Sequence, residues 1–231
     1  MSDINKILIE FFSGLGADLI GFGDITQLPS GHRRDMSVGI SVAVKYPKTV
    51  IAKIIDMPTQ EYFAYYTALN KQLDDIVNKG AQKIIEMGYR AIAQTRKISQ
   101  YGGDLTVLLP HKTAATRAAV GWIGKCALLI TKEFGSAVRL SSILTDAPLE
   151  TAIPYDEGKC GECLICKEAC PAGAVKGKNW KLGIMRDEIL DAQLCMQKAS
   201  QRAASIGVDA TICGRCIAVC PYTKKYLSET P

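Results

Sequence analysis

The sequence lacks the features that mark membrane, secreted and hydrolytic proteins. No uninterrupted apolar stretch approaches the roughly 18 residues that a membrane-spanning helix needs. Residues 1–12 carry acidic and amide side chains where a secretory leader has a basic stretch. There is no glycine-rich phosphate loop, no nucleophile elbow and no paired-carboxylate site. We therefore expect a cytoplasmic protein with no membrane partner, and we find no pattern that favours a hydrolase.

The composition is that of a folded protein. The chain has 231 residues, of which 48% are hydrophobic and 22% are charged. This is too apolar for a disordered chain, and the length suits one large domain or two smaller ones.

Cysteine is the residue type that is abundant and unevenly placed. Eight of the nine cysteines follow residue 159. In a reducing compartment, clustered cysteines bind metal more often than they form disulfides. The first motif is Cys160-x2-Cys163-x2-Cys166-x3-Cys170-Pro171, and the second is Cys213-x2-Cys216-x3-Cys220-Pro221.

This spacing predicts two 4Fe-4S clusters that exchange ligands. Three cysteines at x2 intervals bind one cluster, and the fourth, followed by proline, binds the other. A symmetric second motif would have cysteine at position 210, which is Ala210, and Cys195 upstream can supply the missing thiolate. Zinc sites use paired C-x2-C units and do not fit. We predict one cluster on Cys160, Cys163, Cys166 and Cys220, and the other on Cys170, Cys195, Cys213 and Cys216.

The net charge does not favour a nucleic-acid partner. The formal value is +5 with every cysteine counted as neutral. Two oxidised clusters with their thiolates subtract about 4, which leaves the loaded protein near neutrality.

Helical and strand patterns alternate up to about residue 150, which favours an α/β or α+β layered domain over a helical bundle. We expect helices at 3–13, 60–87, 112–119 and 184–199, and strands at 19–22, 37–44, 91–95, 127–131 and 137–144. Ser2 or Asp3 can cap the first helix, Gly14 can end it, and Gly80 is the weak point of the second.

Two groups of residues in this region suggest a binding surface. Ser37, Gly39, Ser41 and Ala43 form a small-residue face of a strand, which either packs under a helix or faces a flat cofactor. Four aromatic residues open the long helix, and they either fill the core or line a cavity; they are Tyr62, Phe63, Tyr65 and Tyr66.

One stretch of the sequence resembles the epoxyqueuosine reductases. It runs from His111 through Gly121-Trp122-Ile123-Gly124-Lys125, Leu128-Leu129-Ile130 and Gly135 to Leu144-Thr145-Asp146-Ala147-Pro148-Leu149. The lone upstream Cys195 also resembles that family and the related reductive dehalogenases.

The resemblance implies two domains and a second cofactor. Residues 1–152 would form a trimmed nitroreductase-like α/β domain that binds a corrinoid (cobalamin), and residues 153–231 a bacterial, ferredoxin-like domain with two 4Fe-4S clusters, an α+β fold overall. Candidate cofactor-binding residues are Tyr66, Lys112, Arg117, Gly121, Trp122, Gly124 and Lys125. A low-potential donor of the ferredoxin or flavodoxin type would supply electrons.

The sequence departs from this family where the proton donor is expected. A catalytic aspartate precedes the Gly-Trp segment in the family, but Asp104 is offset by one residue and the neighbouring proline and glutamate are missing. We name Asp104 and His111 as catalytic candidates, with Tyr62, Tyr65, Tyr66 and Tyr101 as further proton donors. The family members that act on transfer RNA are longer, so we expect transfer RNA to be the less favoured substrate.

Several single residues have two interpretations. His111 is either a proton donor or cofactor contact, or a hydrogen-bonded residue at a helix start. Cys126, the ninth cysteine, is either a buried small side chain or a redox thiol or pocket residue. Lys112, Arg117, Lys125 and Arg139 are individually expected to be surface charges, with one or two functional. His32 is expected at the surface.

Our leading hypothesis is an oxygen-sensitive iron–sulfur reductase that passes electrons through two 4Fe-4S clusters to a bound corrinoid for a reductive step on an organic substrate. The alternatives are an electron-transfer protein that serves a separate corrinoid or flavin enzyme, and an epoxyqueuosine reductase acting on transfer RNA.

Overall fold

The computed structural model describes residues 2–96, 107 and 109–229. They form two compact units, each assembled from separate stretches of chain. Unit 1 consists of residues 1–44, 69–121 and 139–155, and unit 2 of residues 45–68, 122–138 and 156–231. The predicted division between residues 152 and 153 is a different partition of the chain, and it stays a prediction.

The fold is mixed α/β, in the order α1 Asp3–Gly14, β1 Leu19–Asp24, α2 Ser30–Arg33, β2 Val38–Lys45, α3 Lys48–Ala52, α4 Gln60–Glu86, β3 Ala91–Ala93, α5 His111–Arg117, β4 Trp122–Ile123, β5 Leu129–Ile130, β6 Val138–Thr145, α6 Ile165–Glu168, α7 Arg186–Ile189, α8 Ala192–Ala204, α9 Arg215–Val219 and α10 Pro221–Ser228.

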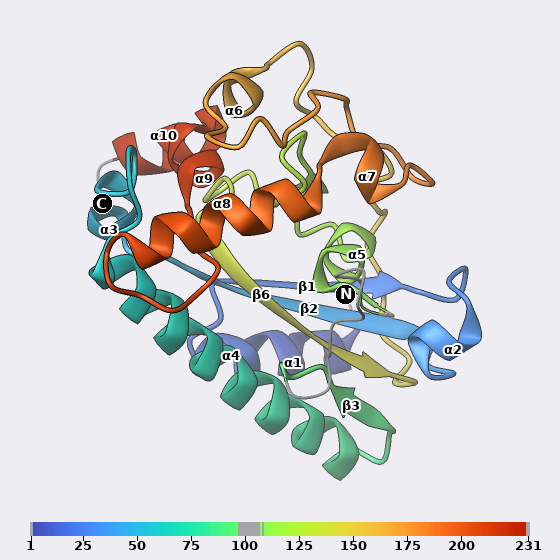
Figure 1. Cartoon of the computed structure of the whole chain (residues 1–231). Helices are drawn as coiled ribbons and strands as arrows, with labels where there is room; N and C mark the ends of the chain where they lie inside the picture. The colour runs from blue at the N-terminus through green and yellow to red at the C-terminus, as the bar shows by residue number, and fades with distance from the viewer. Residues whose placement is uncertain (1, 97–106, 108, 230–231) are drawn as a thin grey trace. The chain divides into compact units, whose positions relative to one another are not determined.

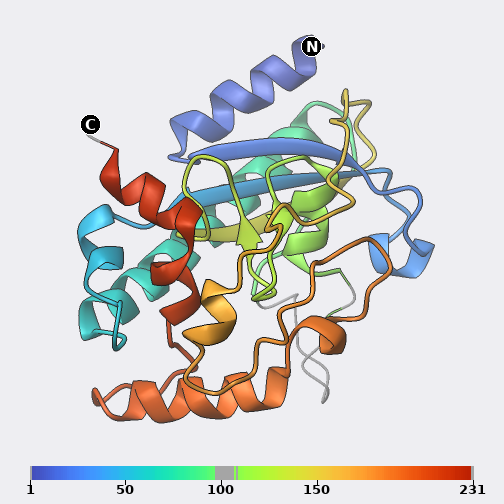
Figure 2. The same cartoon turned by 90° about the horizontal axis from the view of Figure 1, so that it is seen from above.

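Unit 1 is built on a four-stranded sheet in the order β1-β2-β6-β3. Strands β1 and β2 pair antiparallel, as do β3 and β6. Helices α1 and α4 lie on one side of the sheet and α5 on the other (Figure 1), and α1 runs beside β1 (Figure 2). This layering is mixed α/β; its nitroreductase-like character stays a prediction.

The small-residue face of β2 packs against a helix. Its neighbours on β1 are also small, because Gly21 pairs with Ser41 and Gly23 with Gly39. A Cβ atom at Gly23 would lie 2.4 Å from the backbone nitrogen of Ala118, directly after α5. The absence of side chains therefore lets α5 approach the strands closely, which is the packed-helix interpretation of this face.

The opposite side of the sheet is filled by large apolar groups. Phe12 of α1 and Ile143 of β6 are fully buried. Gly80 lies where they meet α4, since a Cβ there would be 2.2 Å from the Phe12 ring. Gly80 lowers the helix propensity of α4, and the packing explains its presence.

The predicted helices and strands are found, with corrections at their ends. Ser2 caps α1 by accepting a hydrogen bond from the Asn5 N–H. The helix ends at Gly14, one residue beyond the predicted 3–13, and Gly16, with φ +89°, takes the left-handed conformation beyond that end.

The predicted helix at 184–199 is two helices. Leu190 is extended, which ends α7, and Asp191 starts α8 by accepting a hydrogen bond from the Leu194 N–H. Cys195 lies in the first turn of α8, as expected of a residue on a helix.

Outside α8, α10 and the first turns of α4, the regular elements of unit 2 are short. Strands β4 and β5 form a hairpin with two residues in each strand. Helices α6, α7 and α9 have four or five residues each. No helix in the part of the chain that the structure describes has the length and apolar character required to cross a bilayer.

Candidate iron–sulfur site

All nine cysteines lie in unit 2. Eight of them are carried by loops and short helices between Cys160 and Cys220, and Cys126 joins them from the β4–β5 hairpin. Cys126 and Cys220 are buried and the other seven are partly exposed. The tertiary structure thus adds one cysteine to the set that the spacing singled out.

The thiols of the first predicted cluster lie close to one another. Burial raises the pKa of Cys160, and the neighbouring Cys166 and Cys163 raise it further. Burial also raises the pKa of Cys220, again with a contribution from Cys160 and Cys166. The tertiary structure therefore groups the four sulfurs that the first cluster requires.

The thiols of the second predicted cluster form a separate group. Burial raises the pKa of Cys195, followed by the charges of Cys170 and Cys213. Helix α8 thus carries Cys195 into the neighbourhood of Cys170 and Cys213. Cys216, the fourth predicted ligand, raises the pKa of the neighbouring Cys126, as does burial. The assignment of ligands to two clusters stays a prediction that this grouping supports.

The described cysteines are not arranged around a single metal ion. Among the described residues, no three His, Cys, Asp or Glu side chains are arranged to hold one metal ion. A single zinc ion would draw four ligands to about 2.3 Å from one centre. The thiolates of a 4Fe-4S cluster each bind a different iron, so they lie farther apart. The prediction of two 4Fe-4S clusters therefore rests on the cysteine motifs.

Cys220 is held at a junction between two helices. It lies between α9 and α10 with an extended backbone, and Pro221 begins α10. Proline suits the first helical position, where no N–H is needed. The N–H groups of Tyr222 and Thr223, which have no partner within the first helical turn, donate to the Cys220 sulfur. These bonds favour the thiolate form that binds iron.

Gly135, from the segment predicted to resemble the epoxyqueuosine reductases, positions α10. Its φ is +59°, and a Cβ there would be 2.3 Å from the Thr223 nitrogen. The N–H of Ser136 donates to the Thr223 hydroxyl over 3.1 Å. Only glycine allows this approach, so Gly135 supports the turn that also binds Cys220.

The Gly-Trp-Ile-Gly-Lys segment contacts the first thiol group. The Trp122 indole and the Lys125 backbone N–H each lower the pKa of Cys160, against the larger effect of burial. A Cβ at Gly124 would lie 3.6 Å from the Cys160 sulfur. Trp122 is 1% exposed, and its ring meets that of Tyr222 edge to face at 4.9 Å. Residues proposed for a corrinoid thus surround a predicted cluster ligand.

The other predicted cofactor residues are spread over both units. Gly121 is buried at the end of a unit 1 segment, and Lys112 and Tyr66 are partly buried. Arg117 is 7% exposed and donates to the Tyr155 carbonyl over 3.1 Å. Lys125 is 4% exposed, so the expectation that Arg117 and Lys125 are surface charges is wrong.

Of the aromatic residues that open α4, Tyr62 is a core residue. It is 5% exposed, and its ring packs on that of Tyr46 at 5.2 Å. Tyr65 is 37% exposed. The catalytic candidate Asp104 and the proton-donor candidate Tyr101 lie outside the described residues.

His111 begins α5 and is bonded to a side chain. Its Nδ1 lies 2.9 Å from the Ser142 hydroxyl. Burial, followed by the positive charge of Arg139, lowers the pKa of His111 to about 4, against a smaller opposing effect of Asp74. The imidazole is therefore neutral at pH 7, so His111 can act there only through a neutral ring. The other histidine, His32, is exposed.

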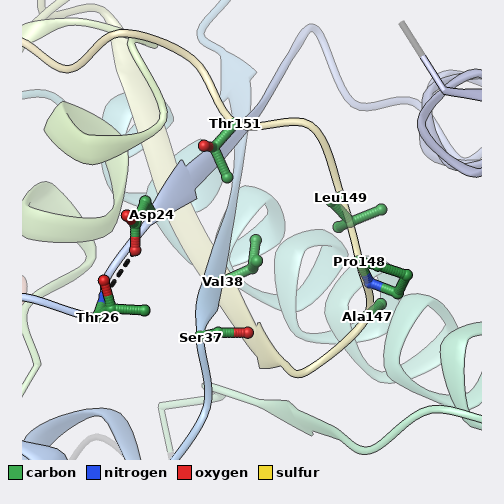
Figure 3. A pocket seen from close by; sticks show the side chains of 8 residues that line it. All are labelled: Asp24, Thr26, Ser37, Val38, Ala147, Pro148, Leu149 and Thr151. Carbon is green, nitrogen blue, oxygen red and sulfur yellow. Dashed lines mark hydrogen bonds between the residues drawn. The ribbon is translucent and has the colours of Figure 1, made fainter.

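A shallow hollow of about 270 Å³ opens on unit 1. Figure 3 shows Asp24 and Thr26 along one side of it and Ala147, Pro148 and Leu149 along another. The Thr26 N–H donates to Asp24 over 2.8 Å and lowers the pKa of that carboxyl group. The hollow is smaller than the usual ligand pocket of about 300–1,000 Å³, so it does not fit a group as large as a corrinoid.

Comparison with known protein families indicates the class of protein to which the cysteine region belongs. Residues 159–223 match the family described as a 4Fe-4S double cluster binding domain. Together with the grouped thiols, this match makes the chain an iron–sulfur protein with a double-cluster domain.

Individual proteins resemble the chain over more of its length than this family does. The chain is 26% identical over 204 residues to the epoxyqueuosine reductase of Aliivibrio fischeri. The aligned region covers 80% of this chain and 49% of that protein. It is also 26% identical over 196 residues to the tetrachloroethene reductive dehalogenase of Desulfitobacterium hafniense. This alignment covers 77% of this chain and 33% of the dehalogenase. The chain therefore spans half or less of these relatives. Its resemblance to epoxyqueuosine reductases and reductive dehalogenases is confirmed.

Solved structures share the fold. An epoxyqueuosine reductase crystallised with an epoxyqueuosine-modified tRNA-Tyr stem loop matches with a TM-score of 0.65 at 23% identity, covering 96% of this chain and 65% of that one. A catabolic reductive dehalogenase in complex with 3-bromo-4-hydroxybenzoic acid matches with a TM-score of 0.71 at 16% identity. The match covers 94% of this chain and 31% of the dehalogenase chain. The prediction that transfer RNA is a less favoured partner gains no support from these relatives.

Proposed function

We propose that this protein is an iron–sulfur reductase of the epoxyqueuosine reductase type, in which two 4Fe-4S clusters deliver electrons to a reductive step. The observation that carries the proposal is the grouping of the thiols within unit 2, in a segment that matches a double-cluster domain. When bound, the clusters supply one-electron transfer at low potential.

The residues of the chain have three tasks in this proposal. The cysteines hold the two clusters. The Trp122 indole and the N–H groups of Lys125, Tyr222 and Thr223 lie at predicted ligand sulfurs, where they would stabilise the added negative charge of a reduced cluster. Burial of Trp122 and Cys220 keeps water away from one side of the first cluster.

The first test is chemical analysis of protein purified without air. We expect about eight iron and eight sulfide per chain, together with the EPR signal of reduced 4Fe-4S clusters after dithionite treatment. About four of each would reduce the proposal to a single cluster. Iron without sulfide would exclude both clusters.

The substrate we propose is an epoxyqueuosine nucleoside in transfer RNA. The support is that an epoxyqueuosine reductase is among the relatives both in sequence and in fold. Reduced protein is incubated with epoxyqueuosine-containing transfer RNA, and the nucleosides are analysed by mass spectrometry. Complementation of a queuosine-deficient strain is the matching test in cells. Failure of both, in protein that carries both clusters, would exclude this substrate.

A corrinoid is the electron acceptor that we propose between the clusters and the substrate. One structural relative is described as acting in B12-dependent dehalogenation. The small-residue face of β2 does not fit a corrinoid, because α5 covers it. We therefore assign the corrinoid no position and derive no step through it. Titration with cob(II)alamin, followed by absorbance and EPR, tests it; an unchanged cobalt signal at micromolar protein excludes a tightly bound corrinoid.

The second candidate function is an electron carrier for a separate corrinoid or flavin enzyme. The closed face of β2 favours it, because that face was the predicted cofactor surface of unit 1. An electron carrier would hold both clusters, bind no cobalamin and show no reductase activity alone. Its donor, in either function, is proposed to be of the ferredoxin or flavodoxin type.

A further inference from the structure

A loop of unit 2 that leads from α6 to α7 presents two large apolar side chains to the solvent (Figure 1). Leu182 is 54% exposed and Met185 is 69% exposed. The backbone that carries them is constrained. The Ile184 N–H donates to the Lys181 carbonyl over 3.0 Å, and the Met185 N–H donates to the Glu188 carboxylate over 3.2 Å. A constrained loop with exposed apolar groups is typical of a surface that binds a partner.

The same loop is anchored in the core of unit 2. Trp180 is 8% exposed and packs with Ala127 and Ile189, and Ile184 packs against this cluster. The apolar residues on either side of Leu182 therefore occupy buried positions, whereas Leu182 itself points away from them. The anchor keeps the exposed part of the loop in place before any partner binds.

The charged residues of this segment all have the same sign. Residues 169–186 contain no acidic residue and four cations, which are Lys176, Lys178, Lys181 and Arg186. Two of them make ion pairs with the acidic residues that follow, Lys178 with Glu188 over 3.4 Å and Arg186 with Asp187 over 3.2 Å. Ion pairs at an exposed surface are weak and can be exchanged for others. Cations around apolar side chains complement a partner with an acidic contact surface.

The loop lies beside the chain of the first predicted cluster. Asn179 Nδ2 donates to the Gly161 carbonyl over 3.2 Å. A Cβ atom at Gly177 would lie 3.2 Å from the Leu164 side chain. Both contacts reach the segment 160–166, which carries three predicted ligands of that cluster. A protein bound to the loop would therefore lie close to the first cluster.

We infer that the docking face, made of Leu182 and Met185 with the four cations of residues 169–186, binds an acidic electron-carrier protein that reduces the first cluster. This inference rests on the proposed function and adds the place where the electron donor binds. The reduced carrier loses one electron and the oxidised cluster gains it, with no proton transferred and no covalent bond changed. A small face suits this task, because interfaces between redox partners are small and transient, and opposite charges raise the rate at which the partners meet.

Two other occupants fit the docking face less well. Single-stranded RNA binds by stacking its bases on exposed aromatic rings, and Trp180, the aromatic residue of this loop, is buried. A second copy of the chain, bound face to face about a two-fold axis, would place the four cations against one another.

The experiment measures how the loaded protein binds and reacts with an acidic plant-type 2Fe-2S ferredoxin. Affinity is measured by calorimetry with both proteins oxidised, so that no electron moves. The rate of electron transfer is then followed from the reduced ferredoxin, whose EPR signal differs from that of a 4Fe-4S cluster. Dithionite is the reference donor, because it needs no docking.

The first variant, Lys178→Glu/Lys181→Glu, reverses two charges of the docking face. Its matched control is Lys71→Glu/Lys79→Glu, at exposed positions of α4 in unit 1. At low salt the affinity and the second-order rate constant should fall about tenfold in the variant and remain near wild type in the control. The difference should vanish at about 1 M salt, where the screening length is about 3 Å.

The second variant, Leu182→Ser/Met185→Ser, removes the apolar groups. Its control is Ile7→Ser/Ile85→Ser, since these two residues of unit 1 are 45% and 49% exposed. The affinity for ferredoxin should fall several-fold in the variant at low and at high salt alike, because apolar contacts are not screened. Reduction by dithionite should be unchanged in all four proteins.

The outcomes separate this inference from the proposed function. Unchanged affinity in both docking-face variants, an equal loss in their controls, or slower reduction by dithionite would overturn the docking site. Weaker binding of transfer RNA with unchanged binding of ferredoxin, or a wild-type dimer that the variants dissociate, would assign the face to another occupant and also overturn it. Wild-type protein without two clusters refutes the proposed function. Ferredoxin binding that depends on the docking face, in a protein that reduces none of the substrates, refutes the reductase and leaves the docking site intact.

Discussion

Unit 1 and unit 2 differ in what fills their interiors. Unit 1 has a four-stranded sheet with fully buried groups such as Phe12, Ile40 and Ile143. Unit 2 has a two-stranded hairpin, several one-turn helices and all nine cysteines. Both units bury apolar side chains, among them Trp122 and Tyr46 in unit 2, so apolar packing can stabilise unit 1 without a cofactor, whereas in unit 2 metal binding would add folding free energy to that of the apolar core. This difference predicts that substitution of a cluster ligand affects unit 2, whereas substitution of a packed residue of the sheet layer affects unit 1.

The largest effect is expected from a cluster ligand in unit 2. Cys195→Ser should lower the iron content from about eight to about four per chain, because the second cluster loses a thiolate. Hydrogen exchange should then increase in unit 2 around α8 and remain unchanged in the sheet of unit 1. The control is Met196→Leu, the next residue of the same helix. Full iron in Cys195→Ser would contradict both the assignment of this ligand and the contrast between the units.

The next effect concerns packing in unit 1. Gly80→Ala should lower the free energy of unfolding by about 2–3 kcal/mol, since the added methyl group overlaps the Phe12 ring and overpacking outweighs the gain in helix propensity. Gly14→Ala in α1 is the matched control, because nothing lies within 4 Å of a Cβ there. Denaturant unfolding of the loaded protein measures both. Equal stabilisation by the two changes would show that the interior of unit 1 is loosely packed.

A smaller effect is expected from His111, and it depends on pH. The folded pKa of about 4 lies below the unfolded value of 6.5, so the unfolded chain binds the proton more readily. Stability should fall as the pH drops from 7 to 5, and this residue should contribute about 2 kcal/mol of that fall.

Replacement of each histidine isolates this contribution. His111→Gln should show a weaker dependence on pH than the wild type, and the exposed His32→Gln should match the wild type. Because both variants retain the clusters, any acid loss of iron affects all three proteins alike. An unchanged pH dependence in His111→Gln would mean that the ring is solvated in unit 1.

The smallest effect is expected at a surface ion pair of unit 1. Asp146, from the segment predicted to resemble the epoxyqueuosine reductases, binds the Arg90 guanidinium at 2.6 Å and also accepts a hydrogen bond from the Arg90 backbone N–H. Its hydrogen bonds with Arg90 lower the pKa of Asp146. Because the Arg90 side chain is 63% exposed, Asp146→Asn should cost less than about 1 kcal/mol. Glu61→Gln, in the exposed pair with Lys53 of unit 2, is the comparison, and iron content should not change in either variant.

Local sequence patterns predicted the regular elements well. The apolar periodicity of α1 and α4 and the alternation of β2 depend only on residues close in sequence, and these elements were found within one or two residues. The break between α7 and α8 was missed because a single extended residue, Leu190, does not interrupt the periodicity. The Asp191 cap was the signal that would have revealed it.

The sequence by itself determined the cysteine chemistry, because x2 and x3 spacings within short loops limit where the thiols can lie. Only the tertiary structure brought Cys126 to Cys166 and Cys216, directed Trp122 at Cys160, and closed the small-residue face of β2 with α5. These contacts join residues far apart in the chain, and their geometry depends on packing rather than on spacing. For that reason the ligands could be predicted from the sequence, whereas the groups that surround them could not.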